Sequence, residues 1–282
     1  FVATSADISN TDFMNGSNIL TFNRAGRDDA TVENNGRITV ADTGIAALVA
    51  PTARNNGVIN ARLSKVHMAG ADTFAVDFYG DGLINFAVGA KAGAAKRTLS
   101  SENNGTIIAD GGVVSMTAAD ASDVVDSVIN NKGTIQAQGL VSRNGEIILT
   151  GKGSTVKVSG KVDASATASG KAGSIKIGGD KQGQGSLARA SNVTVDQNAV
   201  LMADAGDMGN GGTIILWADN NAFSRGQFYA RGGKNGGNGG FVETSSPLFL
   251  DVDGTIVNTL APFGNAGDWL LDPTNINVNA TG

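Results

Sequence analysis

The residues that could support hydrolytic or metal chemistry are few and scattered. The chain has one histidine, His67, and no cysteine. A Ser-His-Asp site would therefore have to use His67, and a thiolate metal site is excluded. No Gly-x-Ser-x-Gly elbow is present to hold a nucleophilic serine. We interpret His67 as a surface loop residue and predict no catalytic, cofactor-binding or metal-ligating residue.

Pairs of carboxylates are a second source of chemistry, because glycoside hydrolysis needs two acids about 5 to 10 Å apart. Three pairs could become neighbours on stacked repeats: Asp77 with Asp81, Asp196 with Asp219, and Asp251 with Asp253. No local motif distinguishes any of these pairs, and the arginines and lysines are scattered. A polysaccharide-active enzyme is thus the weaker alternative to a non-enzymatic protein.

Two glycine-rich segments resemble ligand-binding loops in composition. Asp204, Asp207 and Asn210 lie among glycines, as in calcium-binding repeats, but the nonapeptide does not recur. The run Gly232–Gly240 lacks the Gly-Lys-Ser/Thr ending of a phosphate loop. We interpret the first segment as a solvated turn and the second as a flexible corner between strands.

The few aromatic residues have two interpretations. Trp217 and Tyr229 follow inward-facing positions, so they should face outward and either stack on a glycan or lie beneath a covering loop. We favour packing, and we expect Trp269 to cover the last repeat. We expect a local excursion of the chain between coils to be packed by Phe74, Phe78, Tyr79 and Phe86.

The composition limits the partners of the chain. Its 282 residues include 40 Gly and 4 Pro, 41% are hydrophobic, 17% are charged, and the net charge is −5. Nucleic acid is an unsuitable partner because no concentrated positive face is available. No apolar run reaches the roughly 20 residues of a membrane helix. The chain begins Phe1-Val2-Ala3-Thr4, which is typical of a strand interior and indicates a processed piece of a longer protein.

A short repeat predicts the elements that position these residues. Its apolar and glycine positions alternate with a spacing of two, which indicates strands rather than helices. The copies are Asn34-Gly36-Ile38-Val40, Asn55-Gly57-Ile59-Ala61, Gly82-Ile84-Phe86, Asn103-Gly105-Ile107-Ala109, Asn131-Gly133-Ile135-Ala137, Val158-Gly160-Val162-Ala164, Gln197-Ala199-Leu201-Ala203, Ser224-Gly226-Phe228-Ala230 and Val252-Gly254-Ile256. A second strand pattern follows many of them, as in Gly145-Ile147-Leu149.

The repeats recur every 21 to 39 residues, which lies within the range of solenoids. We therefore predict an all-β fold, a right-handed parallel β-helix of about nine coils, in a single domain of residues 1–282. Residues 1–30 should start the stack, and residues 31–260 should form regular coils with excursions near 62–80 and 178–190. Residues 261–282 should form a terminal coil that leads into a longer shaft. A β-sandwich is the alternative.

Asn and Gly have separate expected roles at the corners. Asn tolerates left-handed backbone and can stack in ladders, and Gly permits the bend without a Cβ clash.

Segments at both ends of the chain resemble one known family. The opening Phe1–Asn10, with Asp12-Phe13 and Gly16, is similar to the middle of the secretion domain of the filamentous haemagglutinin family. Gly239–Ser245 and Trp269–Pro273, followed by Asn275-Ile276, resemble the family's later signature. These proteins are exoproteins of two-partner secretion in Gram-negative bacteria. The family's N-terminal cap and its Asn-Pro-Asn-Gly type motif, which precede the part matched here, are not in this chain.

This resemblance implies a non-enzymatic, secreted or cell-surface exoprotein of the adhesin type, without a cofactor. Its partner would be an outer-membrane transporter, which the chain crosses unfolded, and a host or cell-surface glycan or protein would be its receptor. A self-assembling extracellular filament is the alternative. In that hypothesis the coil edges at Phe1–Ala3 and Asn275–Asn279 stack end to end into a homopolymer.

Overall fold

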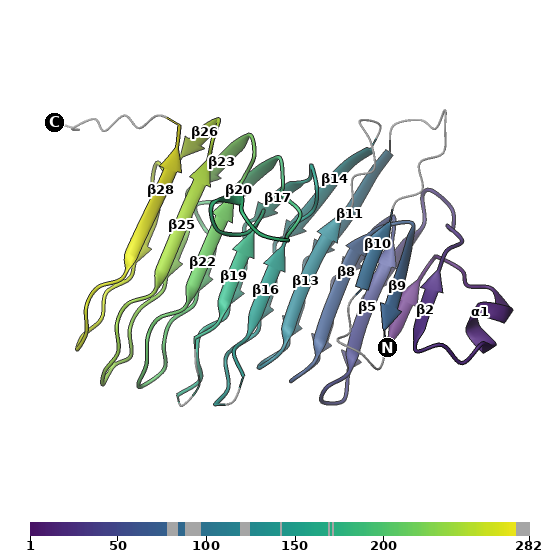
Figure 1. Ribbon diagram of the computed structural model, residues 1–282, viewed down its shortest axis with the longest axis horizontal. Coiled ribbons are helices and arrows are strands. Elements are labelled where there is room, and N and C mark those ends of the chain that lie inside the picture. The colour runs from purple at the N-terminus through teal and green to yellow at the C-terminus, as the bar shows by residue number, and fades with distance from the viewer. Residues whose placement is uncertain are drawn as a thin grey trace.

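The alternating repeat forms three parallel sheets, and each coil of the chain contributes one strand to each sheet. The computed structural model describes residues 1–77, 84–87, 97–118, 125–141, 143–168, 170 and 172–274. In these residues the coils follow one another along a rod (Figure 1). The parallel β-helix predicted from the sequence is confirmed.

Among the described residues, sheet 1 has nine strands, in the order β1 (Val2–Thr4), β5 (Ile45–Ala50), β8 (Lys65–Gly70), β13 (Val113–Ala118), β16 (Glu146–Leu149), β19 (Ser174–Ile177), β22 (Thr213–Trp217), β25 (Phe241–Ser246) and β28 (Asp268–Pro273). The described part of sheet 2 consists of β3 (Thr31–Asn34), β6 (Thr52–Asn55), β11 (Arg97–Asn103), β14 (Val125–Asn131), β17 (Thr155–Val158), β20 (Asn192–Val195), β23 (Asn221–Ser224) and β26 (Phe249–Asp251). Sheet 3 consists, within the same residues, of β4 (Arg37–Thr39), β7 (Val58–Asn60), β12 (Thr106–Ile108), β15 (Thr134–Gln136), β18 (Lys161–Asp163), β21 (Val200–Met202), β24 (Gln227–Tyr229) and β27 (Ile256–Asn258).

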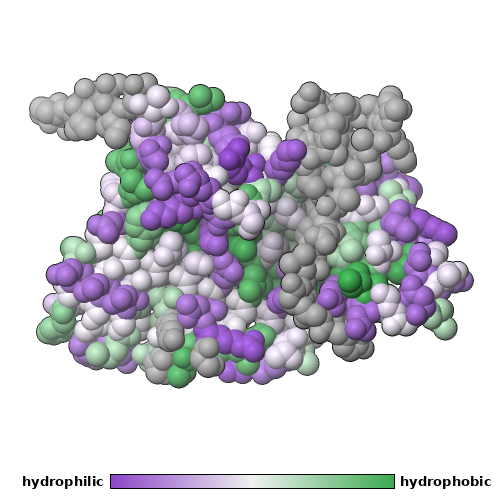
Figure 2. Space-filling view, in the orientation of Figure 1, coloured by the Kyte–Doolittle hydropathy of each residue, from purple (hydrophilic) through white to green (hydrophobic). Residues whose placement is uncertain are grey.

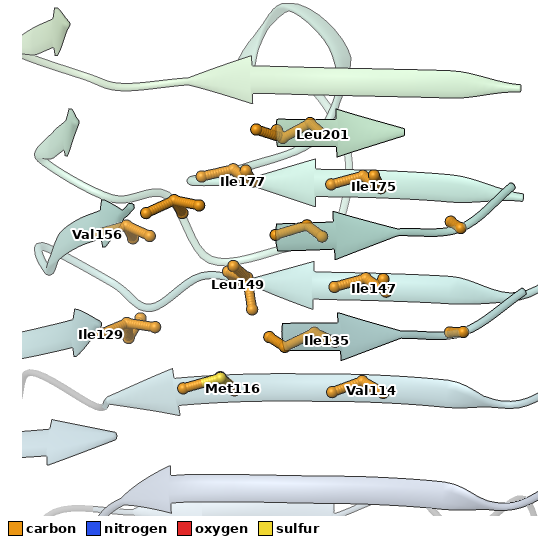
Figure 3. Close-up of a cluster of buried hydrophobic side chains, with 14 of the residues drawn as sticks. Val114, Met116, Ile129, Ile135, Ile147, Leu149, Val156, Ile175, Ile177 and Leu201 are labelled. Carbon is orange, nitrogen blue, oxygen red and sulfur yellow. The ribbon is translucent and has the colours of Figure 1, made fainter. Parts of the chain in front are cut away.

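Equivalent residues of successive coils lie beside one another. Ile107 pairs with Ile59 on one side and with Ile135 on the other, and Ile135 pairs with Val162. Because alternate side chains point inward, this register gathers branched aliphatic residues into columns inside the rod (Figure 3). Fully buried members of these columns include Val114, Met116, Ile129, Ile135, Ile147, Leu149, Val156, Ile175, Ile177 and Leu201. Burial of such side chains is the main source of stability in a rod of this kind.

The interruption after the second full coil differs from the prediction. Lys65–Gly70 (β8) pairs in register with β5 and β13, so the predicted excursion near 62–80 begins only after Gly70. The predicted copy Gly82-Ile84-Phe86 is wrong as a coil. Residues 84–87 form β10 (Ile84–Ala87), which pairs antiparallel with β9 (Thr73–Asp77). The spacing of two is common to any strand, so the sequence pattern did not distinguish this hairpin from a coil.

An antiparallel sheet covers the outer face of sheet 1 near the N-terminus (Figure 1). It consists of β10, β9 and β2 (Ile19–Phe22) in that order. The ring centroids of Phe22 and Phe74 lie 4.5 Å apart in this layer, and both side chains pack with the outward residues of β5. The expected packing role of Phe74 is confirmed, whereas Phe78 and Tyr79 and the side chain of Phe86 lie outside the described residues.

A single short α-helix occurs in the described part of the chain, α1 (Asn10–Met14), and the repeat did not predict it. The Ser9 hydroxyl accepts from the Asp12 amide and so caps its first turn. Among the described residues, no helix has the length and apolar character needed to span a membrane.

The last copy of the repeat is shifted by one residue from its predicted register. The pattern Val252-Gly254-Ile256 predicts that Ile256 faces inward, but Ile256 is 53% exposed. Its neighbour Val257 pairs with buried Phe228 and packs against the core. Phe223 pairs with Asp251 but Phe228 pairs with Val257, so this corner is one residue longer than that of the preceding coil. Gly254 has a φ of 74° in the longer turn.

A column of glycines lets consecutive coils approach closely at the corner between sheets 2 and 3. A Cβ on Gly133 would lie 2.0 Å from the carbonyl oxygen of Gly105, and one on Gly57 would lie 2.1 Å from that of Gly36. Gly36 itself would meet nothing within 4 Å. The predicted Cβ clash is thus confirmed. The predicted left-handed conformation is wrong for the corner asparagines, because the described non-glycine residues with positive φ are Thr43, Leu63 and Gln182.

We expect Gly133→Ala to lower the free energy of unfolding by about 1–3 kcal/mol, because the new methyl group must push two coils apart. Gly36→Ala is the matched control and should be nearly neutral, since its methyl group meets no atom. Thermal and urea unfolding followed by circular dichroism measure both effects. Equal losses in the two variants would contradict the proposed role of close coil approach.

Candidate functional site

His67 lies in a strand, and its interpretation as a surface loop residue is wrong. It pairs with Ala47 and Ser115 on the outer side of sheet 1, and its Nε2 is buried without a hydrogen-bond partner in the described structure. Burial, together with the charge of Lys65, lowers the pKa of His67 to about 4. The ring is therefore neutral near pH 7, and within the described residues its Nε2 forms no hydrogen bond to a serine or a carboxylate.

Two of the three carboxylate pairs considered in the sequence lie within the described residues, and in each of them one acid is paired with an arginine. Asp196 follows β20 of sheet 2, whereas Asp219 follows β22 of sheet 1, so they occupy different corners. Asp219 pairs with Arg189 at 3.0 Å. The Asp251 carboxylate pairs with Arg225 and also accepts the amide of Asp253 at 2.9 Å, which forms a local turn. Asp77 lies in β9, and Asp81 lies outside the described residues.

The segment around Asp204, Asp207 and Asn210, interpreted above as a solvated turn, is held by cations of the next coil. The interpretation is wrong for Asp204, which is buried. Asp204 binds Arg231 at 2.6 Å, and Asp207 pairs with Lys234 at 3.3 Å. The Asn210 side chain accepts a backbone amide at 2.8 Å. Over the described part of the chain, no group of three or more His, Cys, Asp or Glu is arranged to hold a metal ion.

The glycine run Gly232–Gly240 connects β24 to β25 and stacks between the corresponding corners of its neighbours. A strand follows it, so no helix N-terminus faces the loop. Its interpretation as a corner between strands is confirmed.

The large aromatic residues pack against other parts of the chain. Trp217 is only 9% exposed, which favours a covering loop over glycan stacking. The Tyr229 hydroxyl donates to Gln227 at 2.7 Å, and Arg231 lies over its ring at 5.0 Å. Trp269 pairs in register with the inward residue Val242, and its indole donates to Thr244 at 3.0 Å. Trp269 thus lies at the end of the interior columns, as predicted.

The described coils end at β26, β27 and β28, and no described strand pairs with the outer edges of these three strands. We call this surface the terminal edge. Figure 2 shows apolar patches (green) at this end of the rod, on the left. Its exposed large apolar residues are Leu248, Phe249, Ile256, Leu260, Phe263 and Trp269. Unpaired backbone groups beside apolar surface are a template for another strand.

The filament hypothesis concerns this end of the chain. It pairs the edge at Phe1–Ala3 with that at Asn275–Asn279, and the second segment lies outside the described residues. End-to-end assembly therefore stays a prediction.

A loop of residues 178–190, here called the strap, crosses the outer face of sheet 1 toward the terminal edge (Figure 1). It includes the short 3-10 helix η1 (Lys181–Gly183), and hydrophilic side chains gather over this region (Figure 2). Gly183, at a φ of 64°, lies against the indole of Trp217, where a Cβ would come within 2.5 Å of the ring. Lys181 lies over the ring of Phe241 at 4.4 Å. The excursion predicted near 178–190 therefore covers strands of later coils.

The strap also binds a buried carboxylate. The Gln182 amide donates to Oε1 of Glu243 at 2.8 Å, while Oε2 is buried without a hydrogen-bond partner among the described residues. Burial raises the pKa of Glu243, and the Gln182 amide opposes that shift only in part. Neighbouring Lys181 favours the charged form, and Asp272 disfavours it. Glu243 thus connects the stability of the strap to pH.

A buried ladder of amides connects the first coils. Asn34 donates to Asn55 at 2.7 Å, Asn55 to Asn103 at 2.9 Å, and Asn103 to Asn131 at 2.8 Å. Val158 occupies the next position, and Nδ2 of Asn131 has no partner in the described structure. The predicted stacking of the corner asparagines is confirmed. A ladder of this kind selects the register in which each coil docks on the previous one.

Comparison with known proteins finds a match among solved structures. No protein-family model and no curated protein sequence matches this chain. The crystal structure of the HMW1 secretion domain from Haemophilus influenzae aligns with a TM-score of 0.68 and 25% sequence identity, covering 96% of this chain and 74% of that chain. This chain folds like a bacterial secretion domain. The likeness therefore extends along almost the whole stack of coils.

The wild type should lose stability as the pH rises above 4.5, the ordinary pKa of a glutamate side chain. We expect Glu243→Gln to abolish this loss. The pKa is raised in the folded protein, so folding favours the protonated form. Its stabilising contribution is present below the unfolded pKa and is lost as the pH rises through the folded pKa. Thermal midpoints from pH 4 to pH 8 measure this effect. Parallel curves for the two proteins would contradict it.

We expect Asn103→Leu to lower the free energy of unfolding by about 2 kcal/mol or more, because each buried amide group left unpaired costs about 1–3 kcal/mol. Asn104→Leu is the matched control. Asn104 is exposed, and its amide donates to Asn56 on the rod surface, so a loss below about 1 kcal/mol is expected. Chemical unfolding of both variants decides whether the buried asparagine ladder stabilises the stack more than the exposed hydrogen bond between Asn104 and Asn56 does.

Proposed function

We propose that this chain is the β-helical secretion-domain portion of a two-partner secretion exoprotein. In this proposal it crosses the outer membrane of a Gram-negative bacterium unfolded, through a dedicated transporter, and folds on the outside. It acts by export, folding and display rather than by catalysis. The observation that carries the proposal is the structural likeness to a secretion domain over 96% of the chain.

The order of pairing suits folding during export. In all three sheets each described strand pairs with the equivalent strand of the preceding coil, so a coil has its complete template once the previous one has formed. Among the described residues, no strand of a regular coil after the first depends on a partner much later in the chain. A chain that emerges N-terminus first can therefore gain stability one coil at a time.

The covering sheet gives such a process a starting point. The segment β2 precedes the first complete coil, and it pairs with β9 soon after β8 is in place. This closes a separate apolar cluster around Phe74 and Val49 on the outside of sheet 1. The first coils thus gain a second core before the long stack exists, which offsets the low stability expected of a few isolated coils.

The terminal edge suits the display part of the proposal. Parallel strands at this edge, with Trp269 and Phe249 exposed, would support further coils of a longer shaft. The shaft would hold an adhesive surface away from the cell. Adhesion to a glycan or protein receptor is part of the proposal and is supported only by the family resemblance.

Export with a transporter tests the proposed function. The chain is placed behind a cleavable signal peptide and the N-terminal cap, with its Asn-Pro-Asn-Gly type motif, of each transporter's own exoprotein, and is produced in a Gram-negative host with each of a panel of two-partner outer-membrane transporters. We expect folded, protease-resistant chain in the medium with at least one transporter and periplasmic retention without any. Retention with every transporter, or equal release without one, would overturn the proposal.

A further inference from the structure

A recess lies at the corner between sheets 3 and 1 in the last coils. Its cavity volume is about 520 Å³, within the range of small-ligand sites. Residues from three successive coils line it, among them Asp204, Arg231, Lys234, Asn258 and Leu260. Neither the proposed export nor any of the candidate catalytic residues accounts for this recess.

The coil register places its polar groups side by side. Backbone hydrogen bonds from Ala205 to Arg231 and from Gly232 to Leu260 align the three corners. Asp204 is only 7% exposed, and both of its oxygens are occupied. Its Oδ1 accepts the amide of Arg231 at 2.7 Å and Nε at 3.1 Å, and its Oδ2 accepts Nη2 at 2.6 Å. This pairing fixes the plane of the guanidinium group.

The groups that remain on the walls are hydrogen-bond donors. Nη1 of Arg231 takes no part in its pairing with Asp204. Oδ1 of Asn258 accepts the Leu260 amide at 3.1 Å, which leaves the Nδ2 amide for a ligand. Lys234 lies at the rim, 81% exposed and paired with Asp207 at 3.3 Å. A guanidinium, an amide and an ammonium group together favour an anionic acceptor such as a carboxylate.

The remaining wall is apolar, and two backbone amides beside it are already paired. Leu260 is 65% exposed, and Ala261 and Pro262 continue the same wall. The amides of Ala205 and Gly232 donate to the next coil, so they offer no ladder for a peptide strand. A ligand here must be recognised by side chains, with one apolar face and one charged group. A sugar ring with a carboxylate substituent has this combination.

We propose that the recess binds an acidic sugar of the hexuronate class. The carboxylate lies between Arg231, Asn258 and Lys234, and the apolar face of the ring lies on Leu260 and Pro262. The Asp204 carboxylate orients Arg231 without touching the sugar. This inference is independent of how the chain is exported.

Titration with digalacturonate, followed by amide chemical shifts in NMR, tests the proposal. We expect saturable shifts at Gly206, Gly232 and Lys234. Asn258→Asp keeps an oxygen for the Leu260 amide but replaces the donor with a negative charge, so binding should weaken at least tenfold. Asn265→Asp is the matched control. It adds the same charge to the same corner, outside the recess lining, and should leave affinity within about twofold.

A second variant and two other ligands complete the test. Lys234→Gln alters an exposed side chain and should weaken binding several-fold, which serves if Asn258→Asp fails to fold. The neutral disaccharide galactobiose should not bind. Absence of saturable shifts with digalacturonate, equal binding of galactobiose, or stronger binding of the peptide Ala-Ala-Leu with a free C-terminus would each overturn the proposal.

Discussion

The close backbone pairing of successive coils is the constraint on which the rest of the structure depends. Parallel strands lie about 4.8 Å apart, so every corner must pass its neighbour at that distance. Gly133 can do this because it lacks a side chain, and Asn103 can because its amide fills the gap with hydrogen bonds to the coils on both sides. The interior columns follow, since residues held in register must pack on their own equivalents.

Much of the fold follows from the sequence, because a period of two repeated at coil length has few structural solutions. The positions of Ile59, Ile107 and Ile135 in one column were predictable from their spacing alone. The hairpin of β9 and β10 was not, because its alternation is that of any strand and only its antiparallel partners distinguish it. The shift of Ile256 comes from one extra residue in the corner before it, which the spacing of two does not reveal.

The functional surfaces were less predictable than the fold, because they depend on contacts between coils. Nothing near Glu243 in the sequence indicates that residues 178–190 will cover it, since the two segments meet only after three coils have stacked. The recess beside Arg231 likewise combines three corners whose sequences are separately unremarkable glycine-rich turns. His67 was misplaced because the repeat did not show that Lys65–Gly70 is a strand.

The buried asparagine ladder has a direction. Each amide donates toward the C-terminus and accepts from the N-terminal side, so the dipoles of Asn34, Asn55, Asn103 and Asn131 add along the rod axis. The negative end is closed, because the carbonyl of Asn34 accepts the amide of Gly36, whereas the positive end at Asn131 stays open. The ladder is therefore electrically polar, with a hydrogen-bonded end at Asn34 and an open end at Asn131, where Val158 continues the column.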